Sequence, residues 1–216
     1  LSLRLLQGHV EEFAPNLSKE KEEISTFGIK KELYRPFQEI IASLALFYQL
    51  KAKTTFTRID ELVLLGVFTS EGGENLKKAI SHVFKLRLQA HLFYKNEEEF
   101  LCHPEEGKPL DTHLMYLNQE TIGILQEIYR ILIPFHCCAE GFLKLQSKGA
   151  FKKSFFYDEH SKYQGFKFTK TLQYAKAQEA YQQAVALNPN DVNALLHLGL
   201  IEGKMGKEKD ALPRYL

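Results

Sequence analysis

Apolar residues recur at helical spacing along nearly the whole chain, and this periodicity limits its fold more than any other feature. After Pro36, apolar residues follow the i, i+3, i+4, i+7 rule that buries one face of a helix. They are Phe37, Ile40, Ile41, Leu44, Phe47 and Tyr48. No segment alternates apolar and polar residues between turn residues, as a half-buried strand would. The sequence therefore predicts an all-α fold.

Capping residues place two further helices. Thr57 and Asp60 have capping-box spacing, and Gly66 stands where a helix C-cap is expected, so a short helix is predicted between them. Asn118 is a suitable N-cap for a long helix. Its apolar positions are Ile122, Leu125, Ile128, Tyr129, Leu132, Phe135, Phe142 and Leu145.

Another long helix is predicted between these two. It begins at Ser70 or Glu71 and runs to about Glu99, and Gly72 and Gly73 are expected to fray its first turn. Its apolar positions are Leu76, Ile80, Val83, Phe84, Leu86, Leu88, Leu92 and Phe93.

The composition changes near residue 148, which predicts a domain boundary. The segment 148–170 is rich in lysine and aromatic residues, and the sequence after it is rich in Ala, Gln and Asn. We expect a helical domain at 1–147, a linker at 148–157 and a second domain at 158–216. Lysine among aromatics also suits single-stranded nucleic acid, but we expect these aromatics to cover the end of the second domain, so nucleic-acid binding is disfavoured.

The second domain contains an internal repeat with a period of about 34 residues. Ala177, Tyr181, Ala184 and Pro189 of one copy are followed by Leu195, Leu198, Gly199, Gly206, Ala211 and Tyr215 of the next. Small residues allow two helices to cross closely, and Pro189 ends one helix before the next begins. This pattern resembles the tetratricopeptide repeat (TPR), with two copies in 158–216, the second truncated.

The TPR resemblance implies a binding role. TPR arrays bind proteins or peptides in a groove, and the groove positions here are Asn193, Leu196, Leu200 and Lys204. Leu196 and Leu200 replace the basic and asparagine residues with which chaperone-binding members hold a terminal carboxylate. An apolar or mixed peptide is therefore favoured as the partner.

The N-terminal region, roughly 10–145, resembles the helical substrate-binding domain that follows the catalytic domain in protein-PII uridylyltransferase-like nucleotidyltransferases. The resemblance rests on three short elements. They are Lys30, Leu33, Arg35 and Pro36; then Leu65, Gly66, Ser70 and Glu71; and then Leu86, Arg87, Leu88 and His91. Glu32 and Tyr34 depart from the family pattern, because glycines are usual there.

This second resemblance implies that Lys30, Arg35, Arg87 and His91 bind phosphate or a protein substrate. Arginine suits this role because its planar fork makes bidentate contacts. The alternative is that Arg87 and Lys85 are solvated, or pair with an acid on a neighbouring helix.

Nucleotide transfer by this sequence alone is not expected. A nucleotidyltransferase holds two metal ions with a Gly-Ser turn and paired carboxylates, and the sequence contains neither a Gly-Ser dipeptide nor an Asp-x-Asp motif. Two hypotheses follow. The chain is a non-catalytic interaction module that recruits a partner through its TPR groove, or it is the recognition region of a nucleotidyltransferase whose catalytic domain lies upstream.

Bulk properties exclude several other classes. Lys plus Arg total 28 against 27 acids, which gives no global field for nucleic acid or membrane binding. The longest strongly apolar run, Ile40–Phe47, is too short to cross a bilayer.

Three cysteines, two of them adjacent, suit a reducing cytoplasm and disfavour a zinc site, so we expect no metal or cofactor. Because the chain starts at Leu1, we expect a piece of a longer protein.

Overall fold

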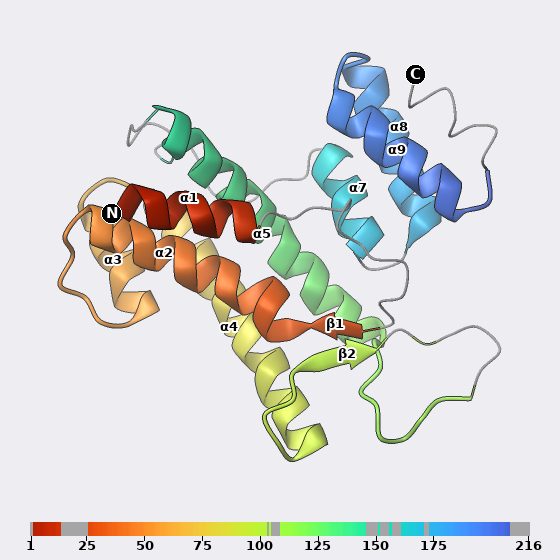
Figure 1. Ribbon diagram of the computed structural model, residues 1–216, viewed down its shortest axis with the longest axis horizontal. Coiled ribbons are helices and arrows are strands. Elements are labelled where there is room, and N and C mark those ends of the chain that lie inside the picture. The colour runs from red at the N-terminus through yellow and green to blue at the C-terminus, as the bar shows by residue number, and fades with distance from the viewer. Residues whose placement is uncertain are drawn as a thin grey trace. The chain divides into compact units, whose positions relative to one another are not determined.

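The computed structural model describes residues 2–13, 26–102, 104, 109–145, 151, 156, 161–170 and 173–207 (Figure 1). These residues are helical apart from one short strand pair and the connecting turns, which confirms the predicted all-α class. The chain divides into two compact units, residues 1–157 and residues 158–216.

Helices of the first unit pack around a long central helix. In chain order the elements are α1 (Ser2–Glu12), β1 (Thr26–Gly28), the π-helical turn η2 (Lys30–Tyr34), α2 (Arg35–Phe47), α3 (Thr55–Leu64), α4 (Ser70–Tyr94), β2 (Phe100–Cys102) and α5 (Gln119–Leu145). Helix α1 lies along α2, and α5 contacts α1, α2 and α4 (Figure 1).

Helix α5 supplies much of the core, and Asn118 caps it as predicted. The Asn118 side chain accepts from the Thr121 N–H, and Thr121 Oγ1 accepts from the Asn118 N–H. Within the described ranges, α5 is the one helix long and apolar enough to cross a membrane, although 61% of its apolar window is buried inside the protein. Core helices share this composition, so it is weak support for a membrane span.

Helix α3 begins earlier than predicted. Its N-cap is Thr54, which forms a capping box with Thr57, and Asp60 instead binds Lys77 of α4 at 2.6 Å. The predicted C-cap is correct: Gly66 has φ +65°, and the Val67 N–H bonds the Leu62 carbonyl in the pattern that closes helices ending on glycine.

Both ends of α4 differ from prediction. Its first turn is not frayed: Thr69 caps it, Gly72 and Gly73 are buried, and a Cβ at Gly73 would lie 2.7 Å from Val63 Cγ2. The glycine therefore allows α3 and α4 to approach closely. The helix stops at Tyr94 rather than near Glu99, because Lys95 adopts a left-handed conformation (φ 57°).

Part of the apolar pattern of α4 faces solvent. Leu88 is 58% exposed and Leu92 is 70% exposed, and Phe84 is also exposed. These residues are spaced four apart and share one face, so the periodicity identified a helix correctly but not which apolar residues it buries.

The strand pair was not predicted. Strands β1 and β2 are antiparallel, with Thr26 opposite Cys102 and Gly28 opposite Phe100. Each has three residues, too few for an alternating pattern to stand out in the sequence.

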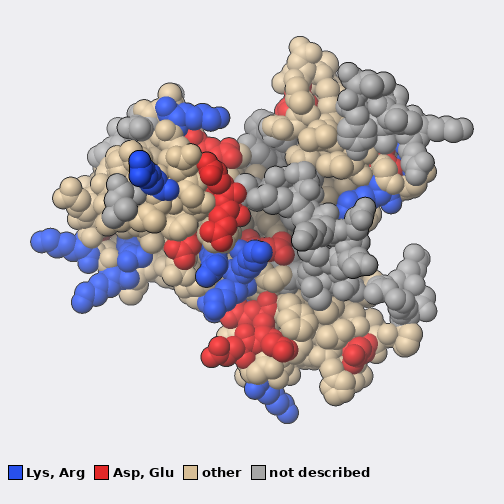
Figure 2. Space-filling view, viewed as in Figure 1, with Lys and Arg blue, Asp and Glu red and all other residues tan. Residues whose placement is uncertain are grey.

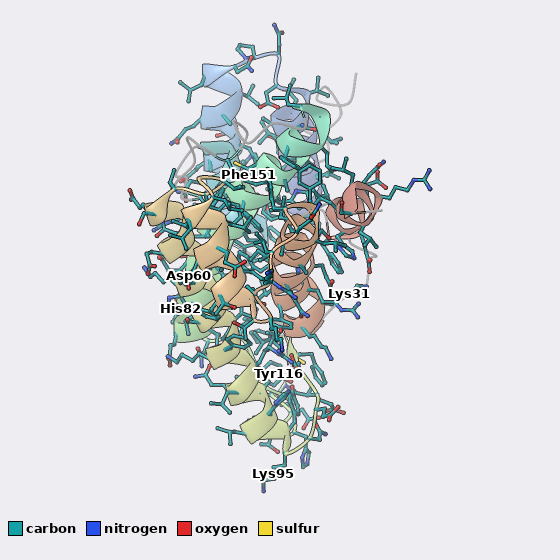
Figure 3. The ribbon with its side chains drawn as sticks, turned by 90° about the vertical axis from the view of Figure 1, so that its left-hand side faces the viewer. Lys31, Asp60, His82, Lys95, Tyr116 and Phe151 are labelled. Carbon is teal, nitrogen blue, oxygen red and sulfur yellow. The ribbon has the colours of Figure 1, made fainter. Side chains whose placement is uncertain are left out.

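The segment after α5 contributes two aromatic side chains to the first unit. Phe151 and Phe156 are fully buried. The ring of Phe156 lies 5.3 Å from those of Phe68 and Phe135, and Phe151 lies 5.5 Å from Phe142, between centroids. Figure 3 shows Phe151 among the helices, whereas Lys31 and Lys95 extend outward. The range predicted as a linker thus includes core residues.

The second unit consists of α7 (Ser161–Lys170), α8 (Tyr174–Leu187) and α9 (Val192–Lys204). Helix α8 packs against both α7 and α9. The turn around Pro189 separates α8 from α9, and the Asp191 carboxylate caps α9 by accepting from the N–H groups of Asn193 and Ala194. The observed helices follow the predicted repeat.

Candidate functional site

Arg87 and His91 lie one turn apart on α4, and both bind Glu99 in the segment before β2. Arg87 Nε lies 2.6 Å from Glu99 Oε2, and Nη2 lies 2.8 Å from Oε1. His91 Nε2 lies 2.9 Å from the same Oε1. The guanidinium therefore holds both carboxylate oxygens in the bidentate arrangement that its planar fork favours.

Tyr34 of η2 completes this group, which we call the Glu99 cluster (Tyr34, Arg87, His91 and Glu99). The Arg87 Cζ atom lies 4.4 Å from the centre of the Tyr34 ring, within cation–π range. The Glu99 side chain is only 7% exposed and that of Arg87 20%. Because an unpaired buried charge is costly, each residue depends on the other.

Burial alone would raise the pKa of Glu99, but hydrogen bonds from Arg87 and His91 outweigh it and hold this pKa below its usual range. The same hydrogen bond from Arg87 to Glu99 raises the pKa of Arg87. The Arg87–Glu99 pair is therefore ionised at neutral pH.

The Glu99 cluster joins distant parts of the first unit. The Glu99 carbonyl accepts from the Ile29 N–H at 2.8 Å, so the residue binds α4 through its side chain and the start of η2 through its backbone. In this structure Arg87 and His91 hold an internal carboxylate. The acid that pairs with Arg87 lies between α4 and β2 rather than on a neighbouring helix, whereas Lys85 does pair with Glu120 of α5 at 2.9 Å.

Lys30 and Arg35 are arranged differently from Arg87 and His91. The Arg35 N–H bonds the Lys30 carbonyl across η2, and both side chains are exposed. Within the described part of the chain neither side chain has an ion pair. The four residues predicted to bind phosphate or substrate thus form two pairs: Arg87 and His91 are held against Glu99, and Lys30 and Arg35 are open to solvent. Figure 2 shows basic and acidic residues interspersed on the visible face of the first unit.

The predicted groove residues all lie on α9. Asn193 and Lys204 are exposed, Leu196 is 38% exposed, and Leu200 is partly exposed. On the opposite face Ala194, Leu198 and Ile201 are buried. Helix α9 therefore presents the four residues along one accessible face.

Close packing between α7 and α8 matches the expected role of small residues in the repeat. A Cβ on Gly165 would lie 2.7 Å from the Tyr181 ring, and Tyr181 is fully buried together with Ala177. The hydroxyl of Thr169 bonds the Gly165 carbonyl at 2.9 Å. Only glycine allows the aromatic ring this approach.

His136, Cys137 and Cys138 follow Pro134 on α5, and none of the three is fully exposed. His136 is buried, and its Nε2 lies 2.8 Å from the Val10 carbonyl of α1; Cys137 and Cys138 are half-buried. In the ranges that the structure covers, no three His, Cys, Asp or Glu residues are grouped so that they could hold a metal ion.

These features define a helical domain followed by the start of a helical repeat array. Residues 9–130, more than half of the chain, match the family described as "Putative nucleotidyltransferase substrate binding domain", and the chain belongs to this family. Residues 169–206 match the TPR repeat. Both resemblances inferred from the sequence are confirmed. No curated protein and no solved structure matches the chain.

Proposed function

We propose that this chain is a non-catalytic recognition module that recruits a protein or peptide partner through the groove face of its second unit. TPR repeats mediate protein–protein interaction, and residues 169–206 match this repeat. The observation that carries the proposal is the accessible face of α9, where Leu196 and Leu200 lie among the polar residues Asn193 and Lys204. Burial of such apolar side chains is the usual source of affinity in a groove.

The chemistry of this face favours a partner segment with apolar side chains. Leucines stand where chaperone-binding TPR proteins hold a terminal carboxylate, so a bare carboxylate would find no clamp there. We place the interaction in the cytoplasm, where the thiols of Cys102, Cys137 and Cys138 would stay reduced. No cofactor, membrane or nucleic acid is part of the proposal.

A variant chain tests this function. Leu196→Glu with Leu200→Glu, introduced into the full chain, should abolish capture of partner proteins that the native chain retains from cell extract. Leu187→Glu is the matched control, because Leu187 is 78% exposed on α8 and outside the groove face. Retention of every partner by the double variant would reject the groove.

The family match supports a second function for the first unit, the recognition of a substrate for a nucleotidyltransferase. The exposed Lys30 and Arg35 are the candidate contacts for a phosphate or an acidic protein surface. In the presence of the cognate catalytic domain, Lys30→Ala with Arg35→Ala should reduce nucleotide transfer to a partner protein. Lys53→Ala, which removes an exposed charge ahead of α3, should not. Equal nucleotide transfer with the native chain, the double variant and Lys53→Ala would contradict this role.

A further inference from the structure

We infer that two copies of this chain associate through the outer face of α4, with their α4 helices antiparallel. Phe84, Leu88 and Leu92, which we call the α4 row, are exposed and follow one another at four-residue spacing along this face. The row extends over two turns of the helix, or about 12 Å. It lies in the first unit and includes none of the groove residues of α9, so this contact is separate from partner recruitment.

The α4 row is an ordered apolar surface. Phe84 is 41% exposed, and its ring centroid lies 5.6 Å from that of Tyr34 and 6.4 Å from that of Phe56. More than half of Leu88 and of Leu92 is exposed. Contiguous exposed apolar side chains mark interaction surfaces, and side chains already fixed on a helix lose little conformational entropy when they are covered. The α4 row therefore favours association.

The α4 row is self-complementary in one orientation. When Leu88 lies on a two-fold axis between antiparallel helices, it faces Leu88 of the second copy, and Phe84 faces Leu92 of the second copy. Each aromatic ring is then matched by a leucine, and the contact occurs twice. A parallel pair would instead place Phe84 against Phe84 and Lys85 against Lys85, which brings like charges together.

Charges at the two ends of α4 favour the same antiparallel orientation. Near the start of the helix, Asp60 and Glu74 both bind Lys77, at 2.6 Å and 2.9 Å, which leaves a net negative charge there. At the other end Lys95 is exposed, and its ammonium has no ion pair within the described part of the chain. Figure 3 shows Asp60 and Lys95 well apart along α4. Antiparallel helices bring Lys95 of one copy toward Asp60 and Glu74 of the other.

A second set of charges is matched in the same way. Glu97 and Glu98 directly follow α4, are exposed, and pair with no basic group among the residues that the structure describes. Lys78 is as far before Leu88 as Glu98 is after it. The Lys78 ammonium lies 3.7 Å from Glu127 Oε2, near the limit of an ion pair. The antiparallel arrangement therefore brings additional acids toward Lys78.

These residues also disfavour a membrane surface as the occupant of the α4 row. Glu97 and Glu98 would be repelled by anionic lipid headgroups, and Lys85 is already paired with Glu120 at 2.9 Å. A second copy, by contrast, supplies both apolar side chains and charges of the opposite sign.

Sedimentation equilibrium of the full chain measures this association. We expect a monomer–dimer equilibrium with a dissociation constant in the micromolar range, because interfaces of limited size are weak. Leu88→Glu places two carboxylates together at the two-fold axis and should weaken the dimer about a hundredfold or more. Leu187→Glu, at an exposed position of α8, is the matched control and should dimerise as the native chain does. Urea unfolding should show native stability in Leu88→Glu, because Leu88 is exposed.

Cysteine cross-linking tests the antiparallel register. Under mild oxidation, a mixture of Phe84→Cys and Leu92→Cys should form mixed disulfide dimers in excess of those from either variant alone, with the native chain as the background. Cross-linking of Phe84→Cys to itself as efficiently as to Leu92→Cys would contradict the antiparallel pair.

Charge reversal tests the pairing at the ends of α4. Lys78→Glu should weaken the dimer about tenfold, since exposed ion pairs contribute little each. Addition of Glu97→Lys and Glu98→Lys to this variant should restore the dimer. Failure of the added lysines to restore it would contradict the pairing.

Three other results would overturn the inference. The first is a native chain that stays monomeric throughout the micromolar range. The second is a dimer that survives Leu88→Glu but is lost in the Leu196→Glu, Leu200→Glu variant, which would place the contact on the α9 face. The third is binding of a monomeric native chain to phosphatidylserine vesicles that is lost with Leu88→Glu, which would assign the α4 row to a membrane.

Discussion

Gly165 of α7 lies directly against the ring of Tyr181 of α8, with no room for a side chain at residue 165. This contact fixes how closely the two helices of the first repeat pack. Because α9 packs on α8, it also supports the helix that presents the groove residues.

Gly165→Ala should destabilise the second unit despite the better helix propensity of alanine. The added Cβ would lie 2.7 Å from the Tyr181 ring. Overpacking costs about 1–3 kcal/mol, whereas the propensity gain is about 0.5–1 kcal/mol, so amide exchange in α7 and α8 should quicken. Gly203→Ala is the control, because no atom lies within 4 Å of its added Cβ. Unchanged protection in Gly165→Ala would show that the two helices can separate at no cost.

Phe151→Ala and Phe156→Ala should each lower the unfolding free energy of the first unit by about 3–5 kcal/mol, as removal of a buried phenylalanine does. Both rings are fully buried. Urea unfolding followed by circular dichroism measures the loss, and Phe93→Ala, at a position of α4 that is 43% exposed, serves as the control. If Phe151→Ala and Phe156→Ala both kept the native unfolding free energy, the first unit would end with α5.

Arg87→Ala should reduce the stability of the first unit, because it leaves the Glu99 carboxylate buried and short of its main partner. Breaking such a pair costs about 3 kcal/mol, whereas Arg35→Ala, at an exposed position, should change stability by no more than about 0.5 kcal/mol. Urea unfolding compares the two variants. If Arg87→Ala kept full stability but lost binding of inorganic phosphate, Arg87 would be a ligand-binding residue instead.

Stability should fall on mild acidification, in part through His136. Burial lowers the pKa of His136, so the folded chain keeps the imidazole neutral while the unfolded chain takes up a proton below about pH 6.5. The contribution is present above that pH and is lost as the pH falls through the folded pKa. His136→Gln, which keeps an N–H for the Val10 carbonyl, should flatten the change in unfolding free energy between about pH 7.5 and about pH 5.5. His113→Gln, at an exposed position, is the control and should not flatten this change. Equal slopes of unfolding free energy against pH in the two variants would refute the role given to His136.

The accessible positions of α9 could be predicted from the sequence, because a repeat fixes register once Pro189 and Gly199 are aligned. The Glu99 cluster could not be predicted from the sequence. Its formation depends on α4 ending at Tyr94, and Lys95 takes the left-handed conformation that usually falls to glycine. A pairing across a chain reversal leaves no periodic pattern. The exposure of Leu88 and Leu92 could not be predicted either, because spacing alone does not show which apolar face of a helix is buried.

Site-specific photocrosslinking tests the central claim most directly. A photoreactive amino acid at Leu196 in the full chain should cross-link one set of proteins in living cells, and these products should disappear when Leu200→Glu is added. The same probe at Leu187, exposed on α8, should not yield them. Identical products from both positions, or products at Leu196 that persist with Leu200→Glu, would contradict recruitment through the α9 face.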